Sequence, residues 1–363
     1  MRSETAFISA VPSEESGLAT EFHRWPLPGY LWPALHHRYQ SIFCSEPHLR
    51  TYGSLHPNIQ AWVARSKGCI SAVILFETKR RVARIINEMH EIDAEQLDKF
   101  SQALFHTSPE IDAICLHAMR IRGTCQRFPW LQTEVSEDYL LSLPSSTEAW
   151  LASLSSQTRE KLRYHHRRSS RKQPDLRFRQ IDAEDITDAQ VQHILQLNRA
   201  RMIHKGRSFN MDGRETDSLR AVMRECGQIS VIEIGGEICA GLLCTRIEKS
   251  VFMHVIAHDP RHDDLRLGYL CCALTIQAAI ESGAKNFHFL WGYYDYKVRL
   301  GGQRQILFRA VFFRSWWHAL THPVLLASQI AQRARNKLRQ WRSLSRALSF
   351  NRSRYVHRHA PDQ

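Results

Sequence analysis

The sequence predicts an α/β fold, with a mixed α+β sheet, arranged as two units that follow one another. The first observation is length, because 363 residues exceed one typical domain of roughly 100 to 200 residues. The second is that short apolar runs alternate with helical patterns throughout residues 25–313. The third is the region after residue 226, where three strand-like runs precede a long apolar helix. Such alternation is typical of a sheet covered by helices.

The first unit is expected at residues 25–144, after a flexible N-terminus at 1–24. Two stretches place apolar residues at helical spacing, and they predict helices at 31–44 and 94–105. Shorter apolar runs bounded by turn residues predict strands at 61–65, 69–76, 82–86, 111–117 and 139–143.

The second unit is expected at residues 145–315, where Ser146 or Thr147 can cap a helix. Its first part predicts helices at 156–171, 188–202 and 214–225, with a strand at 176–181. Its second part predicts strands at 229–234, 238–245 and 251–257, a helix at 267–282, and strands at 287–290 and 306–313. Gly235-Gly236 fits a tight turn between two of these strands, because glycine adopts positive φ at little cost.

Composition excludes several classes of protein. No uncharged apolar run reaches about 18 residues, so no membrane-spanning helix is expected. Residues 1–20 lack the basic start and apolar core of a signal peptide, and a cytoplasmic protein is therefore expected. The nine cysteines show no CxxC pair. The sequence also lacks GxSxG, GxxxxGK, HExxH and GxGxxG, which argues against serine hydrolases, P-loop NTPases, zincins and dinucleotide enzymes.

No metal site is expected. His254, His258 and His262 recur every four residues, which would align them on one face of a helix. However, 251–257 reads as a strand and Asp259-Pro260 as a turn, so the three imidazoles would point apart.

The net charge of +13 is concentrated in two blocks, at residues 157–180 and in the tail from Arg314 onward. Such blocks imply an anionic partner: phosphates of a cofactor, an anionic membrane surface, RNA or an acidic glycan. In the tail, 316–363, apolar residues recur at helical spacing after Pro323, and they are Val324, Ala327, Ala331, Ala334, Leu338 and Trp341. This basic amphipathic helix could lie on an anionic membrane, as a peripheral anchor, or pack on the domain.

The second unit resembles a known family. The residues that carry the resemblance are Phe287-His288-Phe289, Gly292, Tyr296-Lys297, Asp259-Pro260 after a strand, and Gly268 at the start of the long helix. They are similar to the GNAT-like acetyltransferases of cellulose and exopolysaccharide biosynthesis, relatives of the Fem-type aminoacyl transferases, which carry two GNAT-like units in tandem. The resemblance covers residues 25–315 and is strongest from 145 onward. His288 replaces the family's usual Asp, and Arg266 replaces a glycine of the acyl-CoA signature.

The resemblance implies an acyltransferase that uses acyl-CoA, with acetyl-CoA as the expected co-substrate and no metal. The acceptor would be an amine or a hydroxyl, on a glycan or another molecule of polysaccharide or cell-envelope synthesis. One alternative is Fem-type transfer from charged tRNA. The basic helix at 156–171 would suit tRNA phosphates, but it carries a single aromatic residue, Tyr164, for stacking on bases, which weakens this alternative. The other alternative is a non-catalytic scaffold that docks to a membrane synthase.

The donor site is expected at the start of the helix 267–282, because a helix N-terminus binds phosphate. Arg261, Arg266 and Gly268 lie there, and Lys297 could also anchor the donor. In the first unit, by contrast, the acidic Glu91-Ile92-Asp93 precedes the helix and would repel pyrophosphate. That unit is therefore expected to shape the acceptor cleft.

The chemistry needs a base for the nucleophile and a proton for the leaving thiolate. Tyr296 is the first choice for the acid, since a phenol with a pKa near 10 suits a thiolate. His254 and His288 are the candidate bases, although a single histidine is more often structural. Candidate acceptor-binding residues follow the helix 188–202, in a connection that overhangs the acceptor site in this fold, and they are Arg201, His204 and Arg207.

Overall fold

The computed structural model describes residues 8–13, 18–206 and 211–335. The chain divides into two compact units that interleave along the sequence. The large unit takes Met1–Glu77, Ile86–Glu91 and Ser136–Ile306. The small unit takes Thr78–Ile85, Ile92–Val135 and Leu307–Gln363. Both predicted sequence units thus contribute to the large unit.

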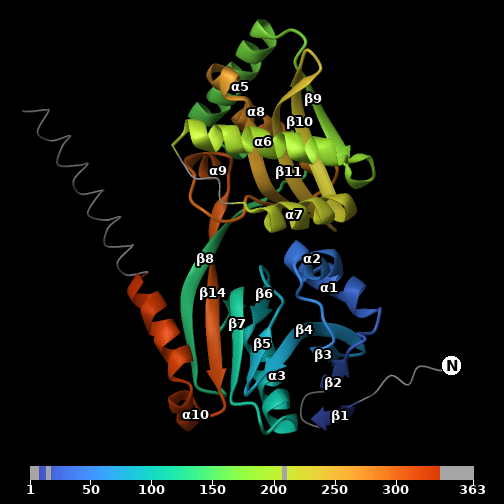
Figure 1. The fold of residues 1–363 in the computed structure, drawn as a ribbon, viewed down its shortest axis with the longest axis vertical. Coiled ribbons are helices and arrows are strands. Elements are labelled where there is room, and N and C mark those ends of the chain that lie inside the picture. The colour runs from blue at the N-terminus through green and yellow to red at the C-terminus, as the bar shows by residue number, and fades with distance from the viewer. Residues whose placement is uncertain (1–7, 14–17, 207–210, 336–363) are drawn as a thin grey trace, which may run out of the picture. The chain divides into compact units, whose positions relative to one another are not determined.

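The sheet that occupies the C-terminal part of the large unit is mixed (Figure 1). Its strand order is β8-β13-β12-β11-β10-β9. Neighbouring strands are antiparallel, except β12 and β13, which are parallel. The strands are β8 Trp130–Ser142, β9 Arg177–Asp182, β10 Gly227–Ile234, β11 Glu237–Ile247, β12 Ser250–His258 and β13 Asn286–His288.

Helices cover both faces of this sheet, because its strands are apolar on both sides. The helices are α4 Thr147–Ser153, α5 Ser156–Lys172, α6 Asp188–His204, α7 Gly213–Cys226, α8 Leu267–Glu281 and α9 Asp295–Arg299. On β11, Leu243 packs with α6 and α7, whereas Leu242 packs with α8 on the other face. Ile194 of α6 lies so close to Gly241 that a β-carbon there would come within 2.7 Å of it. These contacts fix both layers on the strands that carry the site.

The N-terminal part of the large unit is an antiparallel run of strands, β1 Ile8–Ser13, β2 Leu18–Arg24, β3 Ile59–Ser66 and β4 Cys69–Lys79. Short helices, α1 Leu31–Tyr39, η1 Ile42–Cys44 and α2 Glu46–Thr51, connect β2 to β3. Leu31, Leu35 and Leu49 of these helices pack on Val63 of β3 and Val73 of β4. The prediction that 1–24 is flexible is wrong for residues 18–24, because β2 pairs with β3 along its whole length.

The small unit contains β5 Val82–Ile85, β6 Glu91–Asp93, α3 Ala94–Thr107, β7 Ala113–Arg122, β14 Gln303–Phe313 and α10 Trp316–Thr321. Strand β7 is parallel to β5 and antiparallel to β14. The Arg314 guanidinium donates hydrogen bonds to the carbonyl oxygens of Phe105, Ser108 and Ile111. This residue therefore ties the end of β14 to the loop between α3 and β7.

The predicted tail helix is confirmed for residues 323–335. Its packing face differs from the predicted apolar face, because Leu325 and Leu326 contact the small-unit core while Val324 is 79% exposed. Ala327, Ala331 and Ala334 are exposed as well. Leu338 and Trp341 lie outside the described residues.

Other elements follow the predictions, with three differences. The helix predicted at 31–44 ends at Tyr39, where the next residue, Gln40, adopts a positive φ of 47°. Helices α2 and α10 and strand β6 were not predicted, and the cap predicted at Ser146 or Thr147 is Ser146, which begins a separate short helix, α4. Strand β8 begins nine residues before the predicted 139–143, and this extension brings Asp138 into the sheet.

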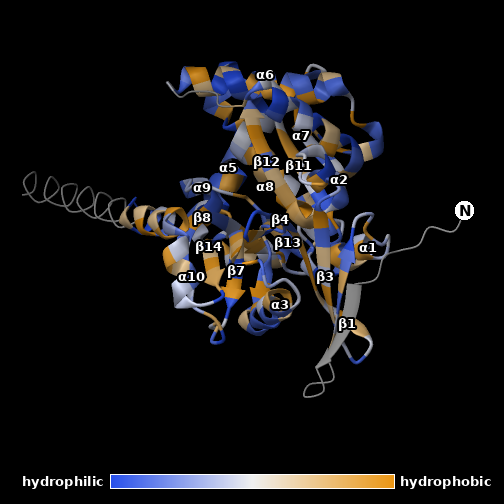
Figure 2. Ribbon diagram, turned by 60° about the horizontal axis from the view of Figure 1, so that its bottom comes forward, coloured by the Kyte–Doolittle hydropathy of each residue, from blue (hydrophilic) through white to orange (hydrophobic). Residues whose placement is uncertain are grey.

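Hydrophobic residues concentrate on β11 and β12 (Figure 2). No helix among the described residues has the length and apolarity to span a membrane.

Candidate active site

Strands β12 and β13 diverge, and this divergence defines the candidate site. They pair only from Ser250–Asn286 to Phe252–His288. Beyond Phe252, β12 continues to His258 with β11 as its strand partner. The register between β11 and β12 shifts at His254, which is the extra residue of a β-bulge. Among the described residues, one edge of the second half of β12 therefore has no strand partner, although Asn198 Nδ2 of α6 donates to the Ile256 carbonyl oxygen. His254 and His288 both lie where this edge starts.

His288 is held by a carboxylate that the sequence analysis missed. Its Nδ1 lies 2.6 Å from Asp138 Oδ2 of β8, and both side chains are buried. The imidazole also stacks on Phe252, with ring centroids 4.2 Å apart. Because the carboxylate accepts the Nδ1 proton, Nε2 carries the lone pair of the neutral ring. Asp138 Oδ1 is buried and has no hydrogen-bond partner among the described residues.

His254 is partly buried and lies beside a hydroxyl group. Its Nε2 is 2.8 Å from the Thr245 hydroxyl. Burial, and to a lesser extent the neighbouring His48, lower the pKa of His254 to about 3. Burial also lowers the pKa of His48, on α2, to about 4. Both imidazoles are therefore neutral at pH 7, and His254 is a weaker base than an ordinary histidine.

An aromatic residue from the N-terminal part of the chain completes this cluster. The Phe43 ring of η1 lies 6.1 Å from Phe252, 6.5 Å from His254 and 5.5 Å from Trp291, measured between ring centroids. Phe43 and His48 were not predicted, because nothing in their local sequence indicates contact with strands about 200 residues later. The N-terminal part of the large unit thus contributes to the site.

Lys297, predicted to anchor the donor, is instead bound to its own loop. Its Nζ donates to the carbonyl oxygens of Leu290, Trp291 and Gly292 at 3.0, 2.8 and 2.9 Å. Burial lowers the pKa of this ammonium to about 8. Since its three protons are all engaged, Lys297 could bind a donor only by releasing the loop that follows β13.

Tyr296, the predicted acid, is partly buried against the core beneath α8. Burial raises the pKa of its phenol, so the group keeps its proton throughout the physiological range. Arg201 of α6 lies near enough for its charge to act on this phenol. Tyr296 and Arg201 are therefore close enough to interact electrostatically.

The start of α8 is built around a glycine and a histidine. Arg266 caps the helix in the left-handed conformation, with φ of 55°. A β-carbon at Gly268 would lie 2.8 Å from Nδ1 of His258, whose Nε2 is 2.7 Å from Asp263 Oδ1. The amides of Leu267 and Gly268 are the first of the helix and have no intrahelical acceptor. Positive charge also gathers here, because Arg201, Lys205 and Arg266 influence the pKa of His258 or Asp263.

The other predicted site residues lie away from the β12–β13 divergence or outside the described residues. The Arg261 side chain turns back to Asp259, with Nε 2.8 Å from Oδ2, and is largely exposed. His204 is exposed at the end of α6. Arg207 lies outside the described residues. Among the described residues, no group of three or more His, Cys, Asp or Glu side chains could hold a metal ion.

Comparisons with known proteins bear on the fold of the chain. Residues 156–298 match the family described as acetyltransferase (GNAT) domain. No curated protein sequence matches the chain. Among solved structures, FemX is similar over 83% of this chain and 99% of its own, with 9% identity and a TM-score of 0.59. A conserved protein of unknown function from Bacteroides thetaiotaomicron is similar over 79% and 98%, with 13% identity and a TM-score of 0.52.

A weaker likeness is to a tandem GNAT protein from the clavulanic acid biosynthesis pathway, over 81% and 98% of the two chains, with 9% identity and a TM-score of 0.41. At these identities the likenesses concern the fold. The chain has a GNAT-like acyltransferase fold, and the predicted α/β class with a mixed sheet is confirmed.

Proposed function

We propose that the protein is an acyltransferase that moves an acyl group, with acetyl-CoA as donor, to an amine or hydroxyl acceptor. The observation that carries this proposal is the divergence of β12 from β13, with His288 at its start. The open edge of β12 offers backbone groups to the amides of a pantetheine arm. It leads through the turn 259–265 to the free amides at the start of α8, which suit a pyrophosphate.

The donor site in this proposal is centred on Gly268 and Arg266. The helix N-terminus and the Arg266 guanidinium both favour a doubly charged phosphate group. Arg261 would join them by exchanging its contact with Asp259 for a phosphate oxygen. Lys297 is assigned a supporting role, since it fixes the loop after β13 through three carbonyl oxygens.

The transfer step uses His288 and Tyr296. The acceptor nitrogen or oxygen attacks the thioester carbonyl carbon, and His288 Nε2 takes the proton that the acceptor loses. The carbon–sulfur bond then breaks, and the Tyr296 phenol gives its proton to the departing thiolate. Asp138 positions His288 by accepting its Nδ1 proton. The low basicity of His254 supports a polar contact to the substrate for this residue, rather than the role of base.

The acceptor would lie on the side lined by the N-terminal part of the large unit. Phe43 and His48 reach the divergence from η1 and α2, which supports the expectation that the first sequence unit shapes the acceptor cleft. Arg201, His204 and Arg207 are proposed to bind the acceptor from the end of α6. We assign the acceptor to polysaccharide or cell-envelope synthesis, and this assignment rests on the motif resemblance alone.

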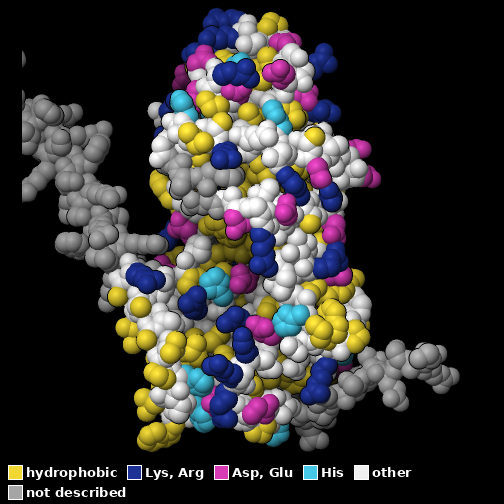
Figure 3. All heavy atoms as spheres, in the orientation of Figure 1, with side chains coloured by type: hydrophobic (Ala, Val, Ile, Leu, Met, Phe, Trp, Pro, Cys, Tyr) yellow, Lys and Arg dark blue, Asp and Glu magenta, His cyan; other side chains and the backbone are white. Residues whose placement is uncertain are grey.

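We also propose that the protein is cytoplasmic and that its tail binds the anionic inner surface of a membrane. Large apolar side chains on α10 and the following helix are exposed, and Figure 3 shows hydrophobic side chains gathered along this edge. They are Trp316, Trp317, Leu320, Val324 and Ile330, with exposed fractions of 62, 77, 66, 79 and 64%. Exposed tryptophans beside a basic segment suit a lipid headgroup layer. Cosedimentation with anionic vesicles should weaken when Trp316 and Trp317 are replaced by serine.

The second candidate is aminoacyl transfer from charged tRNA. It is favoured by the similarity to the FemX structure, with its TM-score of 0.59, and by the basic surface of α5. A scaffold without catalysis is the third reading, and the departures at Arg266 and His288 support it. Binding of acetyl-CoA separates the first proposal from the other two, and a transfer assay with charged tRNA separates those two from each other.

The decisive experiment is isothermal titration of the full chain with acetyl-CoA. We expect saturable binding that is lost in Arg266→Glu and kept in Tyr296→Phe. The Tyr296→Phe variant should instead lose turnover, measured as thiol release with a panel of amine and hydroxyl acceptors. Absence of binding by any acyl-CoA would exclude the acyl-CoA proposal, and transfer from charged tRNA would then be assayed directly.

A further inference from the structure

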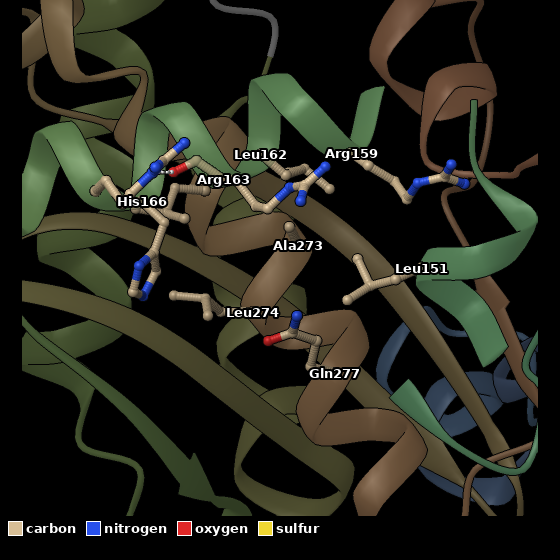
Figure 4. A pocket seen from close by; sticks show the side chains of 10 residues that line it. Leu151, Arg159, Leu162, Arg163, His166, Ala273, Leu274 and Gln277 are labelled. Carbon is tan, nitrogen blue, oxygen red and sulfur yellow. Dashed lines mark hydrogen bonds between the residues drawn. The ribbon is translucent and has the colours of Figure 1, made fainter. Parts of the chain in front are cut away.

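A groove of about 570 Å³ runs between α5 and α8 on the surface of the large unit. Its floor is apolar and is made by Leu151, Leu162, Leu270, Ala273 and Leu274. Figure 4 shows the side chains that line it, with arginines from α5 along one side and Gln277 of α8 on the other. None of these residues belongs to the proposed donor or catalytic site.

The cations of the groove come from one face of α5. Arg159, Arg163 and Arg167 are spaced by four residues, so they line up along the helix, and His166 lies beside them. Arg159 is anchored, because its guanidinium donates to the carbonyl oxygens of Ala152 and Leu154. The other two arginines extend from the exposed rim, and Arg167 makes one long contact, of 3.4 Å, with the Arg163 carbonyl oxygen.

The basic residues on the two sides of α5 differ in whether they form ion pairs. On the far side, Arg168 and Lys172 share an ion pair with Asp264. On the groove side, no carboxylate pairs with Arg163 or Arg167 among the described residues. The groove therefore joins an apolar lining, in which Leu151 and Leu274 are partly exposed, with two exposed cations that pair with no carboxylate among the described residues. Apolar surface left in water is unfavourable, and unpaired cations attract an anion, so one ligand with an apolar part and an anionic group would match both features.

We propose that this groove binds an anionic phospholipid. Its phosphate would lie between Arg163 and Arg167, because a guanidinium can donate two parallel hydrogen bonds to a phosphate. An acyl chain would lie over Leu151, Leu270 and Leu274 and leave water. RNA also carries phosphates, but the groove lining contains no aromatic side chain on which a base could stack. The proposal is independent of the proposed acyl transfer, since it involves neither the same residues nor the same ligand.

The test uses a soluble short-chain lipid. No membrane surface is present, so binding of the tail to a membrane cannot contribute to the measured signal. Dihexanoyl phosphatidylglycerol, below its critical micelle concentration, is titrated into the full-length protein by calorimetry. We expect saturable binding of one lipid, and at least tenfold weaker binding of dihexanoyl phosphatidylcholine. The double variant Arg163→Glu/Arg167→Glu should weaken phosphatidylglycerol binding at least tenfold, and Leu274→Asp should do the same through the floor.

Arg177→Glu is the matched control, because Arg177 is an exposed cation on β9, outside the groove. It should leave lipid affinity unchanged. The arginine variants, at exposed positions, should keep the wild-type melting temperature and the affinity for acetyl-CoA, which separates this proposal from the donor site. Leu274→Asp should lower the melting temperature, because Leu274 packs on the core, and it is compared with the other variants only where it is folded. Absence of saturable lipid binding, or equal weakening by Arg177→Glu, would overturn the proposal. So would binding of a short RNA oligonucleotide that depends on Arg163 and Arg167 in the absence of lipid binding.

Discussion

Asp138 and His288 are 150 residues apart in the chain, and Asp138 Oδ2 lies 2.6 Å from His288 Nδ1. They meet because β8 pairs antiparallel with β13, with Leu140 opposite His288. The carboxylate thus comes from a strand that precedes the whole segment matched by the acetyltransferase family, 156–298. The motif resemblance leads to the expectation of Asp at position 288, and in this chain a carboxylate reaches His288 from the neighbouring strand instead.

Replacing Asp138 by Asn should lower turnover by about 100-fold or more, which is the usual contribution of a general base. An Asn amide can donate to Nδ1, and this would move the imidazole proton to Nε2, where the base is needed. The dissociation constant for acetyl-CoA should stay unchanged, and the acidic limb of the pH–rate profile should shift. Glu137→Gln is the control, since Glu137 pairs with Arg304 instead. Equal turnover in Asp138→Asn and wild type would remove His288 from the mechanism.

Stability should fall as the pH drops from 7 to 5. The folded pKa values of His254 and His48 are about 3 and 4, below the unfolded value near 6.5. The unfolded state therefore binds more protons in this window, and the stability that neutral imidazoles provide above pH 6.5 is lost progressively toward pH 4. Each histidine should cost about 2 kcal/mol of unfolding free energy by pH 5.

Urea unfolding of the His254→Gln variant at pH 7 and pH 5 checks this. Removing the His254 imidazole should reduce the difference in unfolding free energy between the two pH values by about 2 kcal/mol. The control is His204→Gln, because His204 is exposed and should leave the pH dependence as it is in the wild type. An unchanged difference in His254→Gln would mean that this histidine is already solvated in the folded protein.

Lys297→Met should destabilise the large unit by about 2–4 kcal/mol, because three carbonyl oxygens lose their shared donor and the hydrogen bond to Leu290 is a buried one. The loop after β13 should also become more susceptible to proteolysis. Lys285→Met, at an exposed position, should change the unfolding free energy by less than about 0.5 kcal/mol. Denaturant titration of both variants measures the difference. A loss below about 1 kcal/mol in Lys297→Met would indicate that water replaces the ammonium.

Gly268→Ala should weaken acetyl-CoA binding, because the added methyl group would lie 2.8 Å from His258 Nδ1 and displace the start of α8 or the ring. Gly213→Ala, where a β-carbon meets no atom within 4 Å, is the control and should bind normally. The double variant Gly268→Ala/His258→Ala should recover part of the affinity, since the smaller side chain removes the clash. Failure of that rescue would point to the glycine backbone itself, through direct contact with the donor.

The fold was predictable in outline because its signals are local. Apolar runs bounded by Gly235-Gly236 gave strands within two residues of β10 and β11, and the buried helix α8 was evident from its composition. The candidate site was less predictable, because its partners come from distant strands. Lys297 looks like a ligand-binding cation in the sequence, and only the fold brings three carbonyl oxygens around it. Asp138 fell just before a predicted strand, and a single sequence does not tell which strand will pair with it.

The interleaving of the two compact units has a consequence for how the chain can be made and divided. Neither unit is a continuous segment, since the large one resumes at Ile86 and at Ser136 and extends to Ile306. During synthesis, the large unit can therefore complete its fold only after more than 200 residues that follow the N-terminal strands have left the ribosome. A fragment limited to 156–298 would lack both Asp138 and Phe43. The domain boundary suggested by family matching is thus a poor guide to the smallest piece that folds and functions.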